Sequence, residues 1–171
     1  MDDVPALVMG RRTDVLAWNL AADAVFGAAA MAGPGAARAV FLDSQARVDH
    51  LNWDEVAADI AGHLKLEAGR HPDEPLLASL IGELCIASPE FRRLWAHGDV
   101  RQKTTGRTHL DHTLVGELAF SYEVMQIAGR PDQFVTTYAY ERGTPTAERI
   151  QLLLSWNAQT PTVPSVRARP S

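Results

Sequence analysis

The stretch VMGRRTDVLAWNLAADAVFG, residues 8–27, changes from strand-like to helix-like patterning within a few residues. Side chains alternate up to Trp18 as in a half-buried strand, which places Val15 on one face and Trp18 on the other. Asn19 is a good helix N-cap, and the alanine-rich segment after it predicts a short helix ending at Gly27. The glycine and two arginines before the alternating run indicate a turn from an earlier apolar run. The chain is therefore expected to open with a β-hairpin followed by a short helix.

Helical periodicity dominates the middle of the chain. A short helix is expected at residues 36–42. Asn52, at capping-box spacing to Glu55, predicts the start of a longer helix. Two further helices are expected to begin at Pro75 and after the capping residue Ser88.

Strand-like patterning then replaces the helical pattern. Three antiparallel strands are expected, over residues 102–112, 114–127 and 133–141, and a last helix is expected after Thr144. This order predicts an α+β fold, namely a PAS-like five-stranded antiparallel sheet with helices packed on one face. Residues 1–157 would form this one domain, with a ligand pocket between sheet and helices, and residues 158–171 would be a disordered tail.

The composition excludes several classes of protein. The chain has 171 residues, 46% of them hydrophobic, and a net charge of −5, which disfavours direct binding of nucleic acid through its own surface. Its single cysteine, Cys85, cannot form an internal disulfide and is expected to be a buried, inert thiol. No secretory signal or apolar run long enough to cross a membrane is visible, so a cytoplasmic protein without a membrane partner is expected.

Five stretches carry a resemblance to a known family. They are GRRTDVLAWN (10–19), NWDEVA (52–57), SPEFRRLWAHGDVR (88–101), HLDHTLVGELAFSYE (109–123) and PDQFVTTYAYERGTPTAE (131–148). In this order they resemble the ligand-binding domain of MmyB-like transcription regulators, over roughly residues 5–156. The resemblance implies a bacterial, often actinobacterial, dimeric regulator in which a helix-turn-helix domain is joined to a PAS-like domain that can hold a fatty acid.

The sequence also departs from the family pattern. Leu20 stands where a proline is usual, Gly98 stands where the family has His before Asp, and Thr113 stands where it has Pro after His112. These are turn or cap details, so the fold should survive them. No helix-turn-helix is recognised before Val4, and DNA contact is expected only through such a domain outside this chain.

The candidate site residues are those of an apolar ligand pocket. No catalytic residue, cofactor or metal site is expected, since His109 and His112 are three apart on a strand and point to opposite faces. A fatty acid or similar apolar small molecule is the expected ligand. Its chain would be lined by Val15, Phe26, Phe41, Leu84, Phe91, Leu94, Trp95, Leu118, Phe120 and Tyr122, and a carboxylate head could meet Arg12, Arg92 or His112.

Two alternatives to the sensor remain open. One is a small pocket enzyme of the α+β cone type, which could recruit Asp111, His112 and Tyr122. The other is a PAS-like interaction or dimerisation domain without a ligand. The ligand-sensing domain is favoured because it needs an apolar pocket and no catalytic constellation.

Overall fold

The protein forms one antiparallel sheet. The computed structural model describes residues 3–98, 100, 104–159 and 166–168. The sheet order is β3-β4-β5-β1-β2-β6, and every neighbouring pair of strands is antiparallel. The strands are β1 (Ala6–Gly10), β2 (Val15–Asn19), β3 (Thr105–His112), β4 (Gly116–Ile127), β5 (Arg130–Ala139) and β6 (Val166–Ala168).

The α+β class and the five predicted strands are confirmed. The short β6 pairs with the edge strand β2 and lies in the tail that the sequence predicts to be disordered. Residues 160–165 and 169–171 of that tail, and the first two residues of the third predicted strand, lie outside the described residues.

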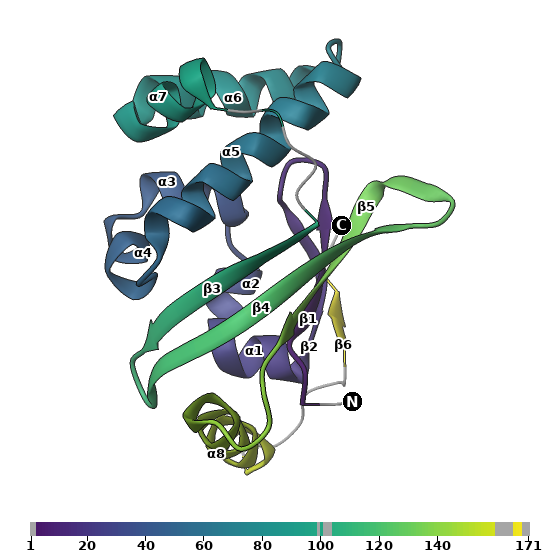
Figure 1. Cartoon of the computed structure of the whole chain (residues 1–171). Helices are drawn as coiled ribbons and strands as arrows, with labels where there is room; N and C mark the ends of the chain where they lie inside the picture. The colour runs from purple at the N-terminus through teal and green to yellow at the C-terminus, as the bar shows by residue number, and fades with distance from the viewer. Residues whose placement is uncertain (1–2, 99, 101–103, 160–165, 169–171) are drawn as a thin grey trace.

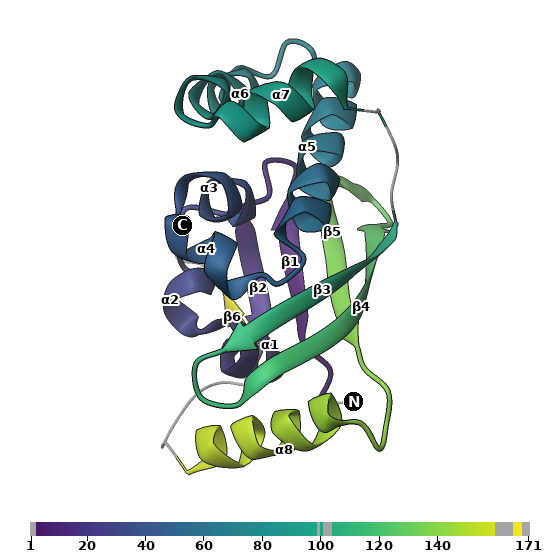
Figure 2. The ribbon, with the colours of Figure 1, turned by 60° about the vertical axis from the view of Figure 1, so that its left-hand side comes forward.

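The helices are arranged along one side of this sheet (Figures 1 and 2). Helices α1 to α5 lie on one face, α6 and α7 stack beyond α5 at one end, and α8 crosses the other end (Figure 2). The predicted helix starts are confirmed, while the short α2 and α4 were not predicted. The helices are α1 (Leu20–Phe26), α2 (Ala28–Met31), α3 (Ala36–Leu42), α4 (Ser44–Asp49), α5 (Trp53–Arg70), α6 (Pro75–Ala87), α7 (Pro89–His97) and α8 (Pro145–Ala158).

A bulge in β2 changes which side chains face the helices. Leu7 pairs with Trp18 and Met9 pairs with Val15, so one extra residue, Leu16, is inserted in β2. Since Leu7 and Met9 share a face of β1, their partners share that face too. Val15 and Trp18 are both buried on it, which corrects the prediction that they point to opposite faces.

Asn52 does not close the predicted capping box. Its side chain accepts no cap hydrogen bond from a backbone N–H of α5, although its Nδ2 donates to Oε2 of Glu55 (3.3 Å). Its Oδ1 instead accepts from the backbone N–H of His109 (2.8 Å), and its Nδ2 donates to the carbonyl of Arg107 (2.9 Å). The amide therefore satisfies backbone groups on the free side of edge strand β3, where an unpaired edge would otherwise be exposed.

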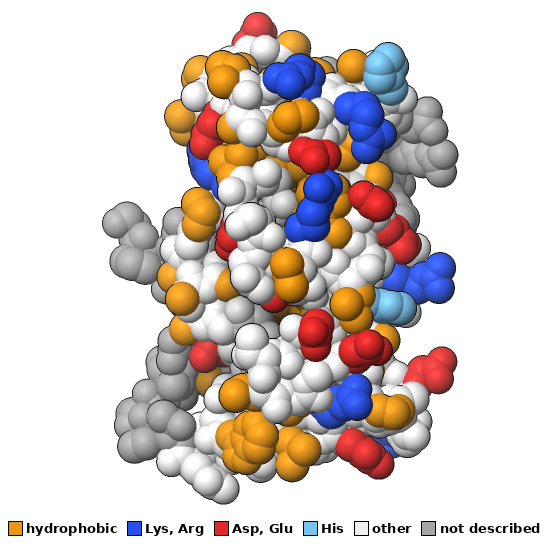
Figure 3. Space-filling view, turned by 90° about the vertical axis from the view of Figure 1, so that its left-hand side faces the viewer, with side chains coloured by type: hydrophobic (Ala, Val, Ile, Leu, Met, Phe, Trp, Pro, Cys, Tyr) orange, Lys and Arg blue, Asp and Glu red, His pale blue; other side chains and the backbone are white. Residues whose placement is uncertain are grey.

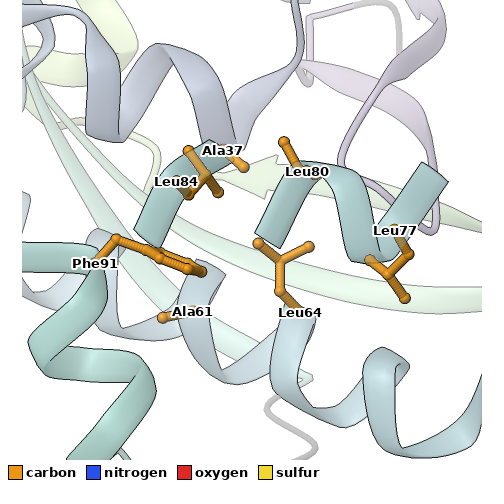
Figure 4. Close-up of a cluster of buried hydrophobic side chains, with 7 residues drawn as sticks. All are labelled: Ala37, Ala61, Leu64, Leu77, Leu80, Leu84 and Phe91. Carbon is orange, nitrogen blue, oxygen red and sulfur yellow. The ribbon is translucent and has the colours of Figure 1, made fainter. Parts of the chain in front are cut away.

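Two separate hydrophobic cores result from this layering. One lies among helices α3, α5, α6 and α7, where Leu64, Leu84 and Phe91 are fully buried (Figure 4). The other lies between the sheet and helices α1 and α8, around Leu118 and Phe120. Helix α5 stands between the two cores.

Candidate ligand-binding site

Helix α5 turns a polar stripe toward the sheet. Asp59, His63 and Glu67 recur every four residues and therefore lie along one face of the helix. The opposite face carries Ala61 and Leu64 in the helical core. Among the described residues, no buried hydrophobic cluster combines side chains of α5 with side chains of a strand. The layer between α5 and the sheet is therefore lined by polar groups.

Tyr122 joins β4 to this stripe. Its hydroxyl donates a hydrogen bond to Oδ2 of Asp59. Burial is the main cause that raises the pKa of Tyr122 well above its usual value, and this hydrogen bond is the second cause. The phenol therefore stays protonated. The ring lies directly over Gly106 on β3, where a Cβ atom would overlap the phenol. Glycine at 106 is thus what allows Tyr122 to reach α5.

Tyr138 lies beside Tyr122 on the next strand. The two residues are paired across β4 and β5, with ring centroids 6.2 Å apart. Phe26 of α1 packs edge-on against Tyr138 at 4.9 Å, and Phe120 does so at 6.0 Å. Burial raises the pKa of Tyr138 to about 12. In the described part of the chain its hydroxyl has no hydrogen-bond partner, so a polar atom is available in an aromatic environment.

Thr136 precedes Tyr138 on the same face of β5. It is 2% exposed, and its Oγ1 is a buried side-chain atom without a hydrogen-bond partner among the described residues. Buried hydroxyls in proteins are nearly always hydrogen-bonded, so an unpaired one calls for an explanation. Its cross-strand neighbours are Val124 and Leu7, which offer no polar atom from their side chains.

His63 faces the same layer from helix α5. Its Nε2 donates to the carbonyl oxygen of Arg11 (3.0 Å), and its ring meets Phe134 edge-on at 5.4 Å. Burial lowers the pKa of His63 below the usual 6.5, which favours the neutral ring at pH 7. With the proton on Nε2, Nδ1 is left as a hydrogen-bond acceptor.

These groups face the layer between α5 and the sheet from both sides, and we name them the inner polar strip. The half-buried Val124 lies on the same face of β4 as Tyr122, two residues further along, and pairs with Thr136 of β5. The strip thus has polar groups next to apolar surface, which is the combination found in binding sites for small organic molecules. Its members are Asp59, His63, Tyr122, Thr136 and Tyr138.

The β1–β2 turn is fixed at one end of this strip. Arg11 Nε donates to Oε2 of the fully buried Glu67 (3.2 Å). Thr13, at φ 64°, accepts from the backbone N–H of Ala37 through Oγ1 (2.9 Å). The turn is therefore held by both α3 and α5.

The structure separates the predicted chain-lining residues into two groups. Val15, Phe26, Leu118, Phe120 and Tyr122 lie on the sheet side, in or beside the sheet core. The second group belongs to the helical core, on the other side of α5; it comprises Phe41, Leu84, Phe91, Leu94 and Trp95. The structure does not bring the ten residues together around one space.

The predicted head-group residues are also apart. Arg92 donates to the carbonyl of Cys85 (2.8 Å) on the exposed side of α7. His112 contacts the carbonyl of Ala24 (3.3 Å) at the far end of β3, and Arg12 lies in the β1–β2 turn. A single carboxylate cannot meet all three.

The enzyme alternative needs residues that the sheet keeps apart. His112 pairs with Gly116, whereas Tyr122 pairs with Gly106, six residues further along the ladder. At about 3.3 Å per residue this separates them by about 20 Å. Asp111 is exposed and points away from the helices. The proposed acid–base group of Asp111, His112 and Tyr122 is not assembled.

The described residues contain no group of three or more His, Cys, Asp or Glu side chains placed to hold a metal ion. None of their helices is both long and apolar enough to cross a bilayer.

Figure 3 shows acidic and basic side chains interspersed over the helical side of the molecule. Arg38 and Glu83, for example, form a bidentate pair there, with Nη2 and Oε2 2.9 Å apart. Neither sign of charge forms a continuous surface over this side.

Sequence reasoning named only Tyr122 among the strip residues. Asp59 and His63 could have been found from their four-residue spacing on the face opposite the apolar one. Thr136 and Tyr138 carry no such signal, because a threonine and a tyrosine are ordinary strand residues. Thr136 is singled out only by its buried Oγ1 without a hydrogen-bond partner, and Tyr138 only by a hydroxyl that has no partner among the described residues.

The strand order and the helices on one face define a PAS-like α+β domain. The model of the MmyB-like transcription regulator ligand binding domain matches residues 1–153, and the chain belongs to this family. This confirms the resemblance found in the sequence. A search of curated proteins found no match. The chain is thus a ligand-sensing regulatory domain of a transcription regulator.

Proposed function

We propose that the domain binds one molecule with a medium-to-long acyl chain, such as a fatty acid, in the layer between α5 and the sheet. The observation that carries this proposal is the incomplete apolar packing of that layer. Tyr122, Val124 and Tyr138 face the helices from β4 and β5, yet each stays half-buried, while the sheet residues beneath α1 and α8 are fully packed.

An acyl chain suits this layer on energetic grounds. Burying about nine methylenes of a ten-carbon chain at ~0.8 kcal/mol each gives roughly 7 kcal/mol of gross stabilisation. Loss of translational and conformational freedom removes part of this, so a ten-carbon ligand should bind with a Kd between millimolar and micromolar. Longer chains should bind more tightly.

The regulator is proposed to act as a homodimer in the bacterial cytoplasm. Contact with DNA would be made by a helix-turn-helix domain outside this chain, which fits the acidic balance of the residues here. Static light scattering at increasing concentration tests the dimer, and a mass that stays monomeric would contradict it.

A bulky side chain placed in the layer between α5 and the sheet tests the ligand proposal. Val124→Trp should abolish binding of decanoate and decan-1-ol in calorimetry, because the indole would occupy the space of the chain. Val135 is also half-buried but lies one residue out of phase, on the outer face of β5, so Val135→Trp is the matched control. Leu118 is unsuitable because it is fully packed in the sheet core.

Native mass spectrometry of the purified protein, followed by analysis of the denatured extract, provides the second test. A copurified acyl compound in the unmodified domain, absent from Val124→Trp, supports the proposal. A domain that binds neither probe and carries no such compound refutes it.

A further inference from the structure

Strands β3 and β2 would end the sheet if nothing covered them, and each is covered in a different way. The segment between α4 and α5 covers β3, since Leu51 N–H donates to the carbonyl of His109 (2.8 Å) and the Asn52 side chain bonds the same strand. This segment is held in place by the helices on either side of it. In contrast, β2 is covered by β6, which pairs with residues 17–19 (Figure 1).

The cover over β2 is weak and lies apart from the domain. β6 forms three backbone pairs with β2, and no described strand pairs with its other side. The family model ends at residue 153, so β6 lies outside the part of the chain that defines the domain. Backbone hydrogen bonds contribute little net stability, and ordering three residues costs conformational entropy. β6 can therefore leave β2 without disturbing either hydrophobic core.

β2 and β6 differ in how well they can pair with a further strand. β2, VLAWN, has five residues, none of them charged and none a proline, so its uncovered edge favours pairing. β6, VRA, has three residues, contains Arg167 and stands between Pro164 and Pro170 in the sequence. Short strands, basic residues and prolines are the features by which proteins prevent edge-to-edge pairing. β6 thus replaces an edge that favours pairing with one that disfavours it.

We propose that β2 is the surface through which two copies of the chain associate edge to edge, and that β6 blocks this association within its own chain. A second copy suits this edge because a strand can pair with itself in antiparallel fashion around a two-fold axis. The half-buried Val8 and Ala17 extend the apolar surface beside the edge, on the sheet face away from the helices. This inference rests on the homodimer of the proposed function.

The cover would act by competing with the second copy. A chain can associate only while its β6 has left β2, and both chains of a dimer must meet this condition. If β6 occupies the edge for about nine-tenths of the time, the apparent dissociation constant of the dimer rises about a hundredfold. Loss of the cover should therefore tighten the dimer.

Arg167→Pro removes the cover in the full chain, because proline lacks a backbone N–H and is not tolerated inside a paired strand. Sedimentation equilibrium should then give a dimer dissociation constant lower by about tenfold or more than that of the unmodified chain. Arg167→Ala is the matched control. It removes the same side chain but keeps the backbone N–H, so it should leave the dissociation constant unchanged.

A disulfide provides the opposite perturbation. Ala17 and Ala168 are cross-strand partners, and the Cα atoms of such partners lie about 4.5–5.5 Å apart, which suits a disulfide. Ala17→Cys with Ala168→Cys, in a chain that also carries Cys85→Ala, should be monomeric when oxidised and should dimerise again when reduced. A disulfide that joins two chains, seen as a doubled mass without reductant, overturns the block within one chain.

A lysine placed on β2 tests where the dimer forms. In the Arg167→Pro chain, Ala17→Lys should abolish association, because an edge lysine disfavours strand pairing. Val135→Lys, on the same outer face but two strands away, should leave association intact. Association that survives Ala17→Lys, or that Val135→Lys also abolishes, places the interface elsewhere and overturns this inference.

The remaining outcomes separate this inference from the proposed homodimer. Equal dissociation constants for the unmodified, Arg167→Pro and Arg167→Ala chains overturn the role of β6 and leave the homodimer standing. Chains that all stay monomeric refute the homodimer together with this inference.

Discussion

Gly106→Ala should destabilise the protein through Tyr122. An alanine Cβ at position 106 would overlap the phenol ring and force it away from Asp59. Overpacking of this kind costs about 1–3 kcal/mol. Loss of the hydrogen bond to a carboxylate adds about 1.5–3 kcal/mol, while replacing a strand glycine returns about 0.5–1 kcal/mol. The free energy of unfolding should fall by about 1.5–5.5 kcal/mol.

Urea unfolding measures this loss, and Gly82→Ala is the control of identical chemistry. Gly82 lies within α6 and has no atom close to where its Cβ would be built. Alanine there should raise the free energy of unfolding by about 1 kcal/mol, because alanine favours helix more than glycine does. The two identical substitutions should therefore change stability in opposite directions.

A double-mutant cycle isolates the cause. In a Tyr122→Ala background the ring is absent, so Gly106→Ala should become neutral or slightly stabilising. If Gly106→Ala costs the same in both backgrounds, or costs nothing in the unmodified protein, the close packing of Tyr122 over Gly106 is refuted.

Three further predictions concern stability. Thr136→Val should raise the free energy of unfolding of the ligand-free protein by about 1–2 kcal/mol, since it removes a buried unpaired hydroxyl, and a decrease in urea unfolding would contradict this. Ser88→Ala should lower it by about 1–2 kcal/mol, because the buried Ser88 Oγ caps α7 by accepting from Phe91 N–H (3.1 Å); an unchanged urea midpoint would contradict this. Burial lowers the pKa of His63 from 6.5, so as the pH falls from 7 to 5 the unfolded state gains its proton first and stability is lost. His63→Gln should reduce that loss in unfolding measured at each pH, and equal losses would refute the assignment.

Local signals in the sequence were sufficient for most secondary structure. The Asn19 side chain accepts from Ala22 N–H (2.9 Å) and Ser88 caps α7, as their residue types predict. Caps and periodicity act over only a few residues, so they are readable without knowledge of the fold. The order of elements they give was also enough to predict the α+β class and the five strands.

The same local rules failed where a distant partner competed. Asn52 has the spacing of a capping box, yet its amide bonds β3 at His109, 57 residues later. The alternation of β2 is interrupted by a bulge that only its pairing with β1 reveals. In both cases the decisive hydrogen bonds join segments that the sequence pattern cannot relate.

The candidate site shows most clearly what the sequence determines and what the tertiary structure decides. By itself the sequence determined a PAS-like domain, its family and the apolar residues available to it, because these follow from patterns within single elements. The tertiary structure alone decided which of those residues share a space, since α5 separates the helical core from the sheet core. It also decided that Asp59 meets Tyr122, 63 residues away, and that the hydroxyls of Thr136 and Tyr138 are left without partners among the described residues. Hydrogen-bond pairing depends on distances that only packing sets, and that is why the polar lining of the site could not be read from the chain.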